Sequence, residues 1–211
     1  MKKFELTNEF ITNMFGTKLF RIRALVEFGD VEAGELGGYV EKESNLGHDD
    51  NAWVYGDARV YDNALVYDNA RVYGDAQVSG DALVYGNARV YGNAWVYGNA
   101  LVCGNALVYG NARVCGDALV CGNARVCSDE DYAYAHGFGS VNRTTTFFRL
   151  KDGGVGVRCG CFYGTLAQFR DKIRETHGET KKAQEYLMLA DLMELRFEED
   201  ENEVGNRKYV E

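Results

Sequence analysis

Three histidines are the side chains in this sequence best suited to proton transfer near neutral pH, namely His48, His136 and His177. A histidine base can activate a hydroxyl or a thiol for acyl transfer, and three converging histidines can hold zinc. No acid–base constellation surrounds any of them, so each is better explained as a surface, capping or helix-end residue. The chain also has no phosphate loop, dinucleotide fingerprint or Gly-x-Ser-x-Gly elbow. We therefore expect a protein with no catalytic residues, no cofactor and no metal site.

Six cysteines are the other residues that could supply nucleophiles or metal ligands. Cys159 and Cys161 form a C-x-C pair, which is not by itself a metal site because a second pair is lacking. The other four lie inside a repeated segment and do not form a secreted disulfide framework: Cys103, Cys115, Cys121 and Cys127. The first ten residues contain two lysines but no apolar stretch, unlike a secretory signal. We expect reduced thiols in a cytoplasmic protein.

Four of these cysteines lie in a segment of thirteen consecutive hexads. The hexads cover residues 51–128 and follow one another without insertion. The consensus is [Asn/Asp]-Ala-x-Val-[Tyr/Cys]-Gly. Ala and Val are two positions apart, so in a strand they point to one face, while x and the residue after Val point to the other. Gly followed by Asn or Asp can take a positive φ at little cost. Each hexad is therefore predicted to be a short strand and a tight corner of a solenoid.

Read from valine as V-Y-G-N-A-R, the unit resembles the hexapeptide repeat of left-handed parallel β-helix proteins. The resemblance implies a left-handed, triangular coil of three hexads, or about 18 residues. Stacked at ~4.8 Å, the thirteen hexads would make a prism roughly 21 Å tall. The resemblance also implies an alternative function, because many such proteins are acyltransferases with a catalytic histidine near a coil. None of the thirteen hexads contains a histidine, which favours a protein that is not an enzyme.

Nearly the whole chain is similar to a group of uncharacterised hexapeptide-repeat proteins of gut bacteria, phages and prophages. The segments that carry the similarity are residues 19–25, 28–31 and 34–40, the hexads, and residues 159–178. This resemblance implies a phage or prophage protein but no established activity. We expect a non-enzymatic binding or scaffold protein, such as one that inhibits a host defence protein or sequesters a small nucleotide. A structural solenoid that forms polymers is a third alternative.

The segments on either side of the hexads are predicted to cap the solenoid, whose open ends would otherwise expose core and strand edges. Residues 1–39 form the N-terminal β cap, in which a strand over 18–25 pairs with 4–6. Residues 40–128 form the β-helix, with a two-residue insertion between Leu46 and Val54. The predicted fold is thus an all-β solenoid with a small α+β module at its C-terminal end.

That C-terminal module covers residues 129–211 and is predicted to have the order ββαα. A loop over 129–139 precedes a hairpin of strands 144–150 and 155–160. Thr165 then caps a helix that ends at His177-Gly178, and a second helix starts at about Thr180. The acidic tail 198–203 is expected to be frayed.

Residues 18 apart stack on successive coils, so the outward positions fall into three faces. One face carries leucine at every x position and, in the next outward column, tyrosine followed by cysteine. We call the following six residues the leucine surface: Leu65, Leu83, Leu101, Leu119, Tyr67 and Tyr85. Because an apolar strip is rarely left in water, it is predicted to contact another protomer in a dimer or trimer, or to be covered by the C-terminal helices. The simpler alternative is that leucine is merely tolerated there.

The two other faces mix arginine with aromatic side chains and are candidate contacts for a ligand or partner. One carries Arg59, Trp95 and Arg113, and the other carries Arg71, Arg89, Tyr73 and Tyr91. Such surfaces can bind phosphates, bases or acidic proteins, and they also occur as ordinary solvated sheet faces. A net charge of −9 argues against nucleic acid, and no apolar run is long enough to span a membrane. One corner column is asparagine throughout, which predicts a ladder of coil-to-coil hydrogen bonds.

Overall fold

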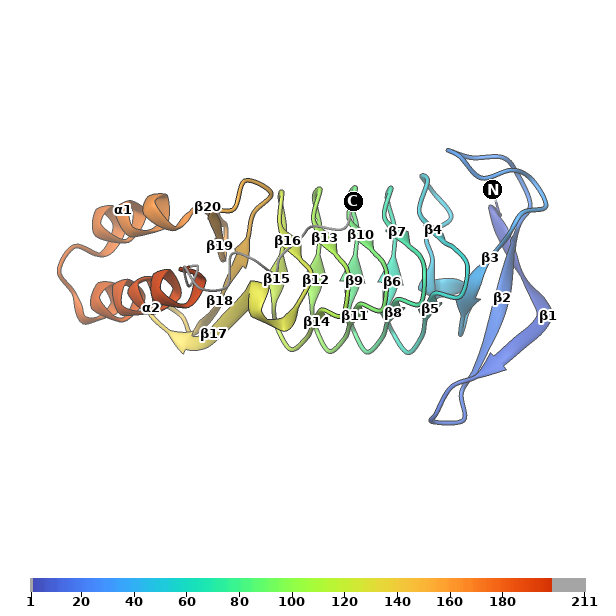
Figure 1. Cartoon of the computed structure of the whole chain (residues 1–211), viewed down its shortest axis with the longest axis horizontal. Helices are drawn as coiled ribbons and strands as arrows, with labels where there is room; N and C mark the ends of the chain where they lie inside the picture. The colour runs from blue at the N-terminus through green and yellow to red at the C-terminus, as the bar shows by residue number, and fades with distance from the viewer. Residues whose placement is uncertain (1, 199–211) are drawn as a thin grey trace.

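The structure is a computed structural model that describes residues 2–198. A parallel β-solenoid forms the middle of an elongated molecule, with a β-hairpin at the N-terminal end and a small sheet with two helices at the other (Figure 1). This architecture confirms the predicted solenoid with about 18 residues per coil. The solenoid has three flat sides, and each side is one parallel sheet whose strands come from successive coils.

The strands of the three sides are two residues long, and each pairs with the strand 18 residues away. The leucine side contains β6 (Leu65–Val66), β9 (Leu83–Val84), β12 (Leu101–Val102) and β15 (Leu119–Val120). The second side contains β4 (Trp53–Val54), β7 (Arg71–Val72), β10 (Arg89–Val90), β13 (Leu107–Val108) and β16 (Arg125–Val126). The third side contains β5 (Arg59–Val60), β8 (Gln77–Val78), β11 (Trp95–Val96) and β14 (Arg113–Val114).

The hexad consensus explains this geometry residue by residue. The Ala and Val of every hexad point inward and are at most 1% exposed, because a three-sided coil leaves room for only small and β-branched side chains at its centre. The predicted asparagine ladder forms in two segments, with Nδ2 donating to Oδ1 from Asn51 to Asn69 at 3.0 Å, and from Asn87 to Asn105 at 3.3 Å and on to Asn123 at 3.4 Å. Stability therefore comes mainly from each coil's contacts with its neighbours.

Two corners replace the consensus glycine by aspartate and show what that position requires. The corner glycines have positive φ, and a Cβ placed on Gly104 would lie only 2.9 Å from the backbone nitrogen of Gly122 on the next coil. Asp62 and Asp68 also have positive φ, at 57° and 56°. Each carboxylate accepts a hydrogen bond at 3.1 Å from the backbone N–H of the next coil's glycine. That bond offsets the cost of a left-handed, non-glycine residue.

Asp68→Ala is expected to lower the free energy of unfolding by about 1–2 kcal/mol, because alanine keeps the backbone strain and loses the hydrogen bond to Gly86. Asp68→Gly restores the consensus residue, removes the strain and should be nearly neutral. Urea denaturation of the two variants checks this, and equal losses for both would contradict the explanation.

The N-terminal cap continues one side of the solenoid. Strand β3 (Leu36–Val40) pairs parallel to β5, β2 (Lys18–Ala24) pairs antiparallel to β3, and β1 (Phe4–Thr12) pairs antiparallel to β2. The predicted pairing of 4–6 with 18–25 is confirmed, with Phe4 opposite Ala24. A 3-10 turn, η1 (Glu43–Asn45), lies where the first coil departs from the regular repeat.

The C-terminal module contains more β-strands than the sequence pattern predicted. It contains a four-stranded antiparallel sheet of β17 (Tyr132–Phe138), β18 (Arg143–Arg149), β19 (Val155–Cys159) and β20 (Phe162–Thr165). The expected loop over 129–139 is wrong, because it holds a 3-10 turn, η2 (Asp129–Asp131), and then β17. The Asp131 carboxylate accepts the backbone N–H groups of Cys127 and Ser128, and Tyr132 donates to the Arg113 carbonyl at 2.7 Å. The bond from Tyr132 joins residues 19 apart and holds a strand where local composition indicated a loop.

Two helices complete the module, α1 (Leu166–His177) and α2 (Lys181–Phe197), with N-caps at Thr165 and Thr180 as predicted. Their apolar sides pack against the module's own sheet, in a cluster that includes Phe147, Phe169 and Tyr186. The expectation that these helices cover the leucine surface is therefore wrong for the described residues. Of the predicted frayed tail, residues 199–203 lie outside the described part of the chain.

Candidate functional site

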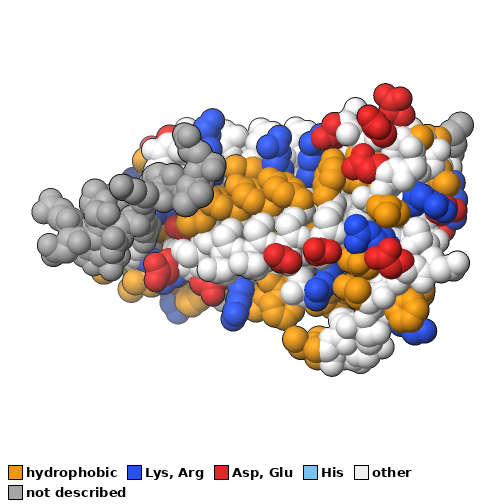
Figure 2. Space-filling view, turned by 45° about the vertical axis from the view of Figure 1, so that its right-hand side comes forward, with side chains coloured by type: hydrophobic (Ala, Val, Ile, Leu, Met, Phe, Trp, Pro, Cys, Tyr) orange, Lys and Arg blue, Asp and Glu red, His pale blue; other side chains and the backbone are white. Residues whose placement is uncertain are grey.

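The leucine surface is a regular apolar strip on one side of the solenoid. Leu65, Leu83, Leu101 and Leu119 lie opposite one another in consecutive strand pairs, and all four are partly exposed. The rings of Tyr67 and Tyr85 stack beside them with centroids 5.0 Å apart and planes 7° apart. Neither column contains Asp, Glu, Lys or Arg. Figure 2 shows how hydrophobic side chains gather into lengthwise bands along the repeat region.

The strip ends at the C-terminal module. There the Leu119 backbone N–H donates to the hydroxyl of Thr146 on β18 at 2.9 Å. The module thus closes the end of the leucine side, while the helices lie beyond it (Figure 1). Among residues 2–198, neither helix covers the leucines on the coils before β15.

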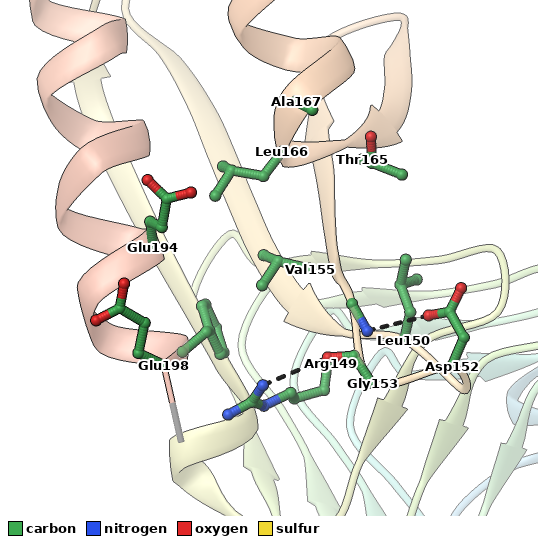
Figure 3. A pocket seen from close by; sticks show the side chains of 12 residues that line it. Arg149, Leu150, Asp152, Gly153, Val155, Thr165, Leu166, Ala167, Glu194 and Glu198 are labelled. Atoms are coloured by element: carbon green, nitrogen blue, oxygen red, sulfur yellow. Dashed lines mark hydrogen bonds between the residues drawn. The ribbon is translucent and has the colours of Figure 1, made fainter. Parts of the chain in front are cut away.

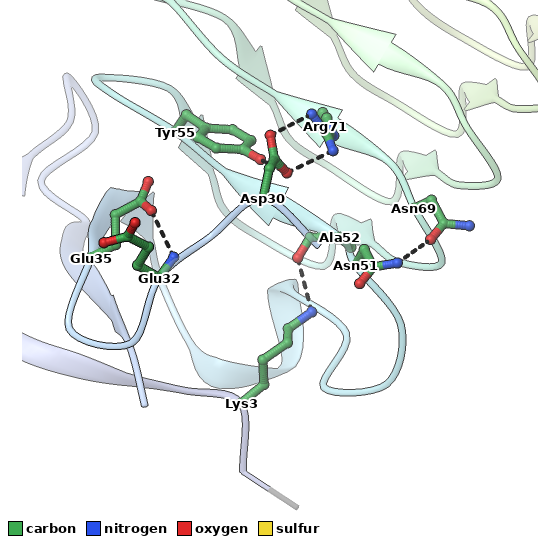
Figure 4. A network of polar contacts seen from close by, with 9 residues as sticks. All are labelled: Lys3, Asp30, Glu32, Glu35, Asn51, Ala52, Tyr55, Asn69 and Arg71. Atoms are coloured by element: carbon green, nitrogen blue, oxygen red, sulfur yellow. Dashed lines mark hydrogen bonds and ion pairs between the residues drawn. The ribbon is translucent and has the colours of Figure 1, made fainter. Parts of the chain in front are cut away.

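The predicted arginine–tyrosine contacts do not form one site. Arg71 is held by Asp30 from the N-terminal cap through two hydrogen bonds of 2.7 and 2.8 Å, and the Tyr55 hydroxyl donates to Asp30 at 3.1 Å (Figure 4). Arg71 therefore anchors the cap to the solenoid. Arg89, one coil further along, is exposed, and together with Tyr73 it borders a hollow of about 350 Å³ beside this ion pair.

The tyrosines on this side stack on one another from coil to coil. Tyr73 and Tyr91 lie 4.8 Å apart with planes 3° apart, and Tyr91 and Tyr109 lie 5.1 Å apart with planes 7° apart. The shared ring faces are therefore occupied, and the ring edges and hydroxyls point outward. Burial raises the pKa of Tyr109 to about 12, so its hydroxyl stays a neutral donor. The faces between these rings are therefore not available for stacking on a base, and a nucleotide ligand stays a prediction.

The other predicted residues, Arg59, Trp95 and Arg113, lie on the third side of the solenoid. The Trp95 indole N–H donates to the Ser79 hydroxyl at 3.2 Å, and its ring packs against Tyr97 with centroids 5.0 Å apart. Arg113 borders a hollow of about 400 Å³ that Arg196 also lines. These residues lie on a different side from Arg71 and Arg89, as the assignment of outward positions to three faces predicted.

A further hollow of about 320 Å³ lies in the C-terminal module between the β18–β19 turn and the helices (Figure 3). Its polar groups are used internally. Arg149 lies over the Phe197 ring at 5.3 Å, Asp152 accepts from the Gly154 backbone, and Glu194 pairs with Arg170. The hollow therefore shows no convergent polar groups that would orient a ligand.

The three histidines occupy separate structural positions at the ends of the molecule. His48 stacks on Phe4 with centroids 4.5 Å apart and accepts the Lys3 backbone N–H at 3.2 Å. His136 contacts the Thr144 hydroxyl at 2.9 Å, and His177 stacks on Tyr186 at the end of α1. Within residues 2–198, no three His, Cys, Asp or Glu side chains gather where they could hold a metal ion.

The cysteines are all present as thiols. Cys159 ends β19 and accepts a hydrogen bond from Thr145 at 3.2 Å, whereas Cys161 lies in the turn after it. The strand ends between the two cysteines, so they do not lie side by side on one face of it. Sequence reasoning also missed Arg158, which β19 brings near Cys103; no spacing in the sequence relates the two residues.

Comparison with known proteins is consistent with the architecture. No curated protein shows a significant match to the chain. Among the described residues, no helix is long and apolar enough to cross a membrane. Six segments match the family model described as YdcK Beta solenoid repeat, namely residues 58–74, 66–80, 76–92, 82–98, 88–104 and 100–116. The central hexads are thus similar to this repeat family, and the chain contains a β-solenoid repeat domain.

Proposed function

We propose that the chain is a non-enzymatic scaffold protein that pairs with a second copy through the leucine surface. The observation that carries the proposal is the row of four partly exposed leucines in register, on a side that the C-terminal helices leave open. Contiguous apolar surface of this kind favours a contact that removes it from water.

A second copy is the occupant that fits this surface best. With a net charge of −9, two copies repel each other most weakly through a side whose outward columns carry no charge. The strip is flat and periodic, so a two-fold axis can place the leucine rows of two copies against each other. Four rungs at ~4.8 Å span only about 20 Å, at the small end of protein interfaces. We therefore propose a dimer that forms and dissociates with concentration.

Other functions have less support. End-to-end stacking would have to join the caps rather than the coils, because β1–β3 and the β17–β20 sheet lie at the two ends of the solenoid (Figure 1). An acyltransferase would need a base in a groove, whereas each histidine is engaged by a neighbour at an end of the molecule. A host protein as partner, a phage or prophage origin and a cytoplasmic location stay predictions from the resemblance.

The pairing is tested with the double variant Leu65→Arg and Leu83→Arg. Burying two unpaired charges at a symmetric contact should raise the dissociation constant of the dimer at least ~100-fold. Sedimentation equilibrium over a range of concentrations measures it. The fold tolerates such a pair, because Arg71 and Arg89 are in-register neighbours at the same repeat position on another side.

The matched control is Gln77→Arg with Leu107→Arg, which adds the same charge at the same repeat position on the other two sides. We expect this control to dimerise like the wild type. A wild type that stays monomeric at all concentrations, or a control that dissociates equally, would refute the proposal.

A further inference from the structure

Cys103 and Cys121 occupy the same position on adjacent coils, at the C-terminal end of the leucine side. Val102 pairs with Val120, and the Cys103 backbone N–H donates to the Val120 carbonyl at 3.0 Å, so the two cysteines are in register. In-register residues of neighbouring strands are about 4.8 Å apart. That spacing falls inside the Cα–Cα range of about 4.4–6.8 Å that a disulfide spans. The two cysteines are therefore already placed to be joined, on adjacent coils in register.

The surroundings make the two thiols chemically unequal. A hydrogen bond from Cys121, aided by the Tyr85 hydroxyl and the positive charge of Arg158, lowers the pKa of Cys103 to about 6 even though burial opposes this. The same shared hydrogen bond and burial raise the pKa of Cys121. Tyr67, the remaining titratable group of this column, lies on the far side of Tyr85. The shared hydrogen bond therefore favours the thiolate at Cys103, with Cys121 as its donor.

Cys103, the thiol with the lowered pKa, is also the more exposed of the two. Cys103 is partly exposed on the open side of the solenoid, whereas Cys121 is only 7% exposed beside the C-terminal module. A small oxidant from solution therefore meets Cys103 first. An attacking thiolate on the surface with a second, protected thiol beside it is the arrangement of a redox-sensing pair.

We propose that Cys103 and Cys121 form a reversible redox pair that hydrogen peroxide oxidises to a disulfide between two coils. The Cys103 thiolate attacks a peroxide oxygen, the O–O bond breaks, and a sulfenic acid and hydroxide form. The Cys121 sulfur then attacks the Cys103 sulfur, and the sulfenic oxygen leaves as water with the Cys121 proton. Two thiols and one peroxide thus give one disulfide and two waters.

Neighbouring cysteines in the repeat lack this arrangement. Cys115 lies on another side of the solenoid, where its sulfur contacts the Tyr132 hydroxyl at 3.6 Å. Cys127 donates to the Asp131 carboxylate at 3.0 Å. Cys115 thus has the same repeat position and a tyrosine contact but no in-register cysteine, which makes it the matched control.

The test is treatment of the wild type with one equivalent of hydrogen peroxide, followed by intact-mass measurement under denaturing conditions. We expect a loss of two hydrogens that dithiothreitol reverses, and a link between tryptic peptides 90–113 and 114–125. Cys115→Ser should keep both, whereas Cys121→Ser should abolish the link and leave a sulfenic acid on Cys103 that dimedone traps. Serine is accommodated at this repeat position, as Ser79 shows.

A link that survives Cys121→Ser, or no oxidation at Cys103, would overturn the redox pair. The inference goes beyond the proposed pairing, but both use the leucine side, so we expect peroxide to reach Cys103 in the dissociated form of the protein. The experiment is therefore repeated with the Leu65→Arg and Leu83→Arg variant, in which we expect the same product. If sedimentation shows no dimer, the disulfide measured by intact mass still stands. If no disulfide forms, the sedimentation result still stands.

Discussion

Trp53→Ala is expected to lower the free energy of unfolding by about 3–5 kcal/mol, the largest effect of any single substitution considered for this chain. Trp53 is fully buried although it occupies an x position, which elsewhere in the repeat points to solvent. The N-terminal cap covers it, with the rings of Phe28 and Phe4 at 5.3 and 6.2 Å. Its indole N–H has no hydrogen-bond partner within the described residues, so the loss comes from packing alone.

The matched control is Trp95→Ala, at the same repeat position but partly exposed on another side. Removing it deletes contacts with Tyr97 and Ser79 only, so we expect a loss of about 1 kcal/mol. Urea denaturation of both variants measures the difference. Equal losses would mean that the cap contributes little to the stability of the first coil.

The solenoid could be predicted because the residues that determine each strand and corner lie within a single hexad. Every hexad contains its own inward pair and its own corner, so the strands, their register and the asparagine ladder all follow from a period of six residues. The leucine surface follows from the same period, since residues 18 apart must stack. The pairing of residues 4–6 with 18–25 was also predictable. It depends on alternating apolar residues in two segments that a short connection joins, and both features can be read from neighbouring residues.

Features that depend on contacts between distant segments could not be predicted. The ion pair between Asp30 and Arg71 joins residues 41 apart, and it turns a predicted ligand contact into an anchor. Strand β17 is held in part by the bond from Tyr132 to the Arg113 carbonyl, 19 residues away, although the composition of this segment is typical of a loop. The approach of Arg158 to Cys103 likewise depends on how β19 packs on the solenoid, which no period in the sequence encodes.

The stability of the wild type relative to Lys3→Met is expected to rise as the pH increases from 8 to about 10.5. Lys3 is only 3% exposed, and its Nζ donates to the backbone carbonyl of Ala52 at 2.9 Å while lying over the Phe28 ring. Burial lowers the pKa of Lys3 from 10.5 to about 8, although the charges of Asp50 and Asp49 partly oppose the shift. The folded protein therefore holds a proton on Lys3 less firmly than the unfolded chain does.

Because the unfolded chain binds more protons in this interval, a higher pH favours the folded state. The charged form costs about 3 kcal/mol below pH 8, and this cost disappears as the pH rises through 10.5. Urea denaturation of wild type and Lys3→Met between pH 7 and 10.5 measures the difference, in which the titration of tyrosines common to both proteins cancels. The matched control is Lys2→Met, which removes the same charge from an exposed lysine paired with Glu43. A difference that stays constant with pH for Lys3→Met would show that the lysine is not desolvated by the cap.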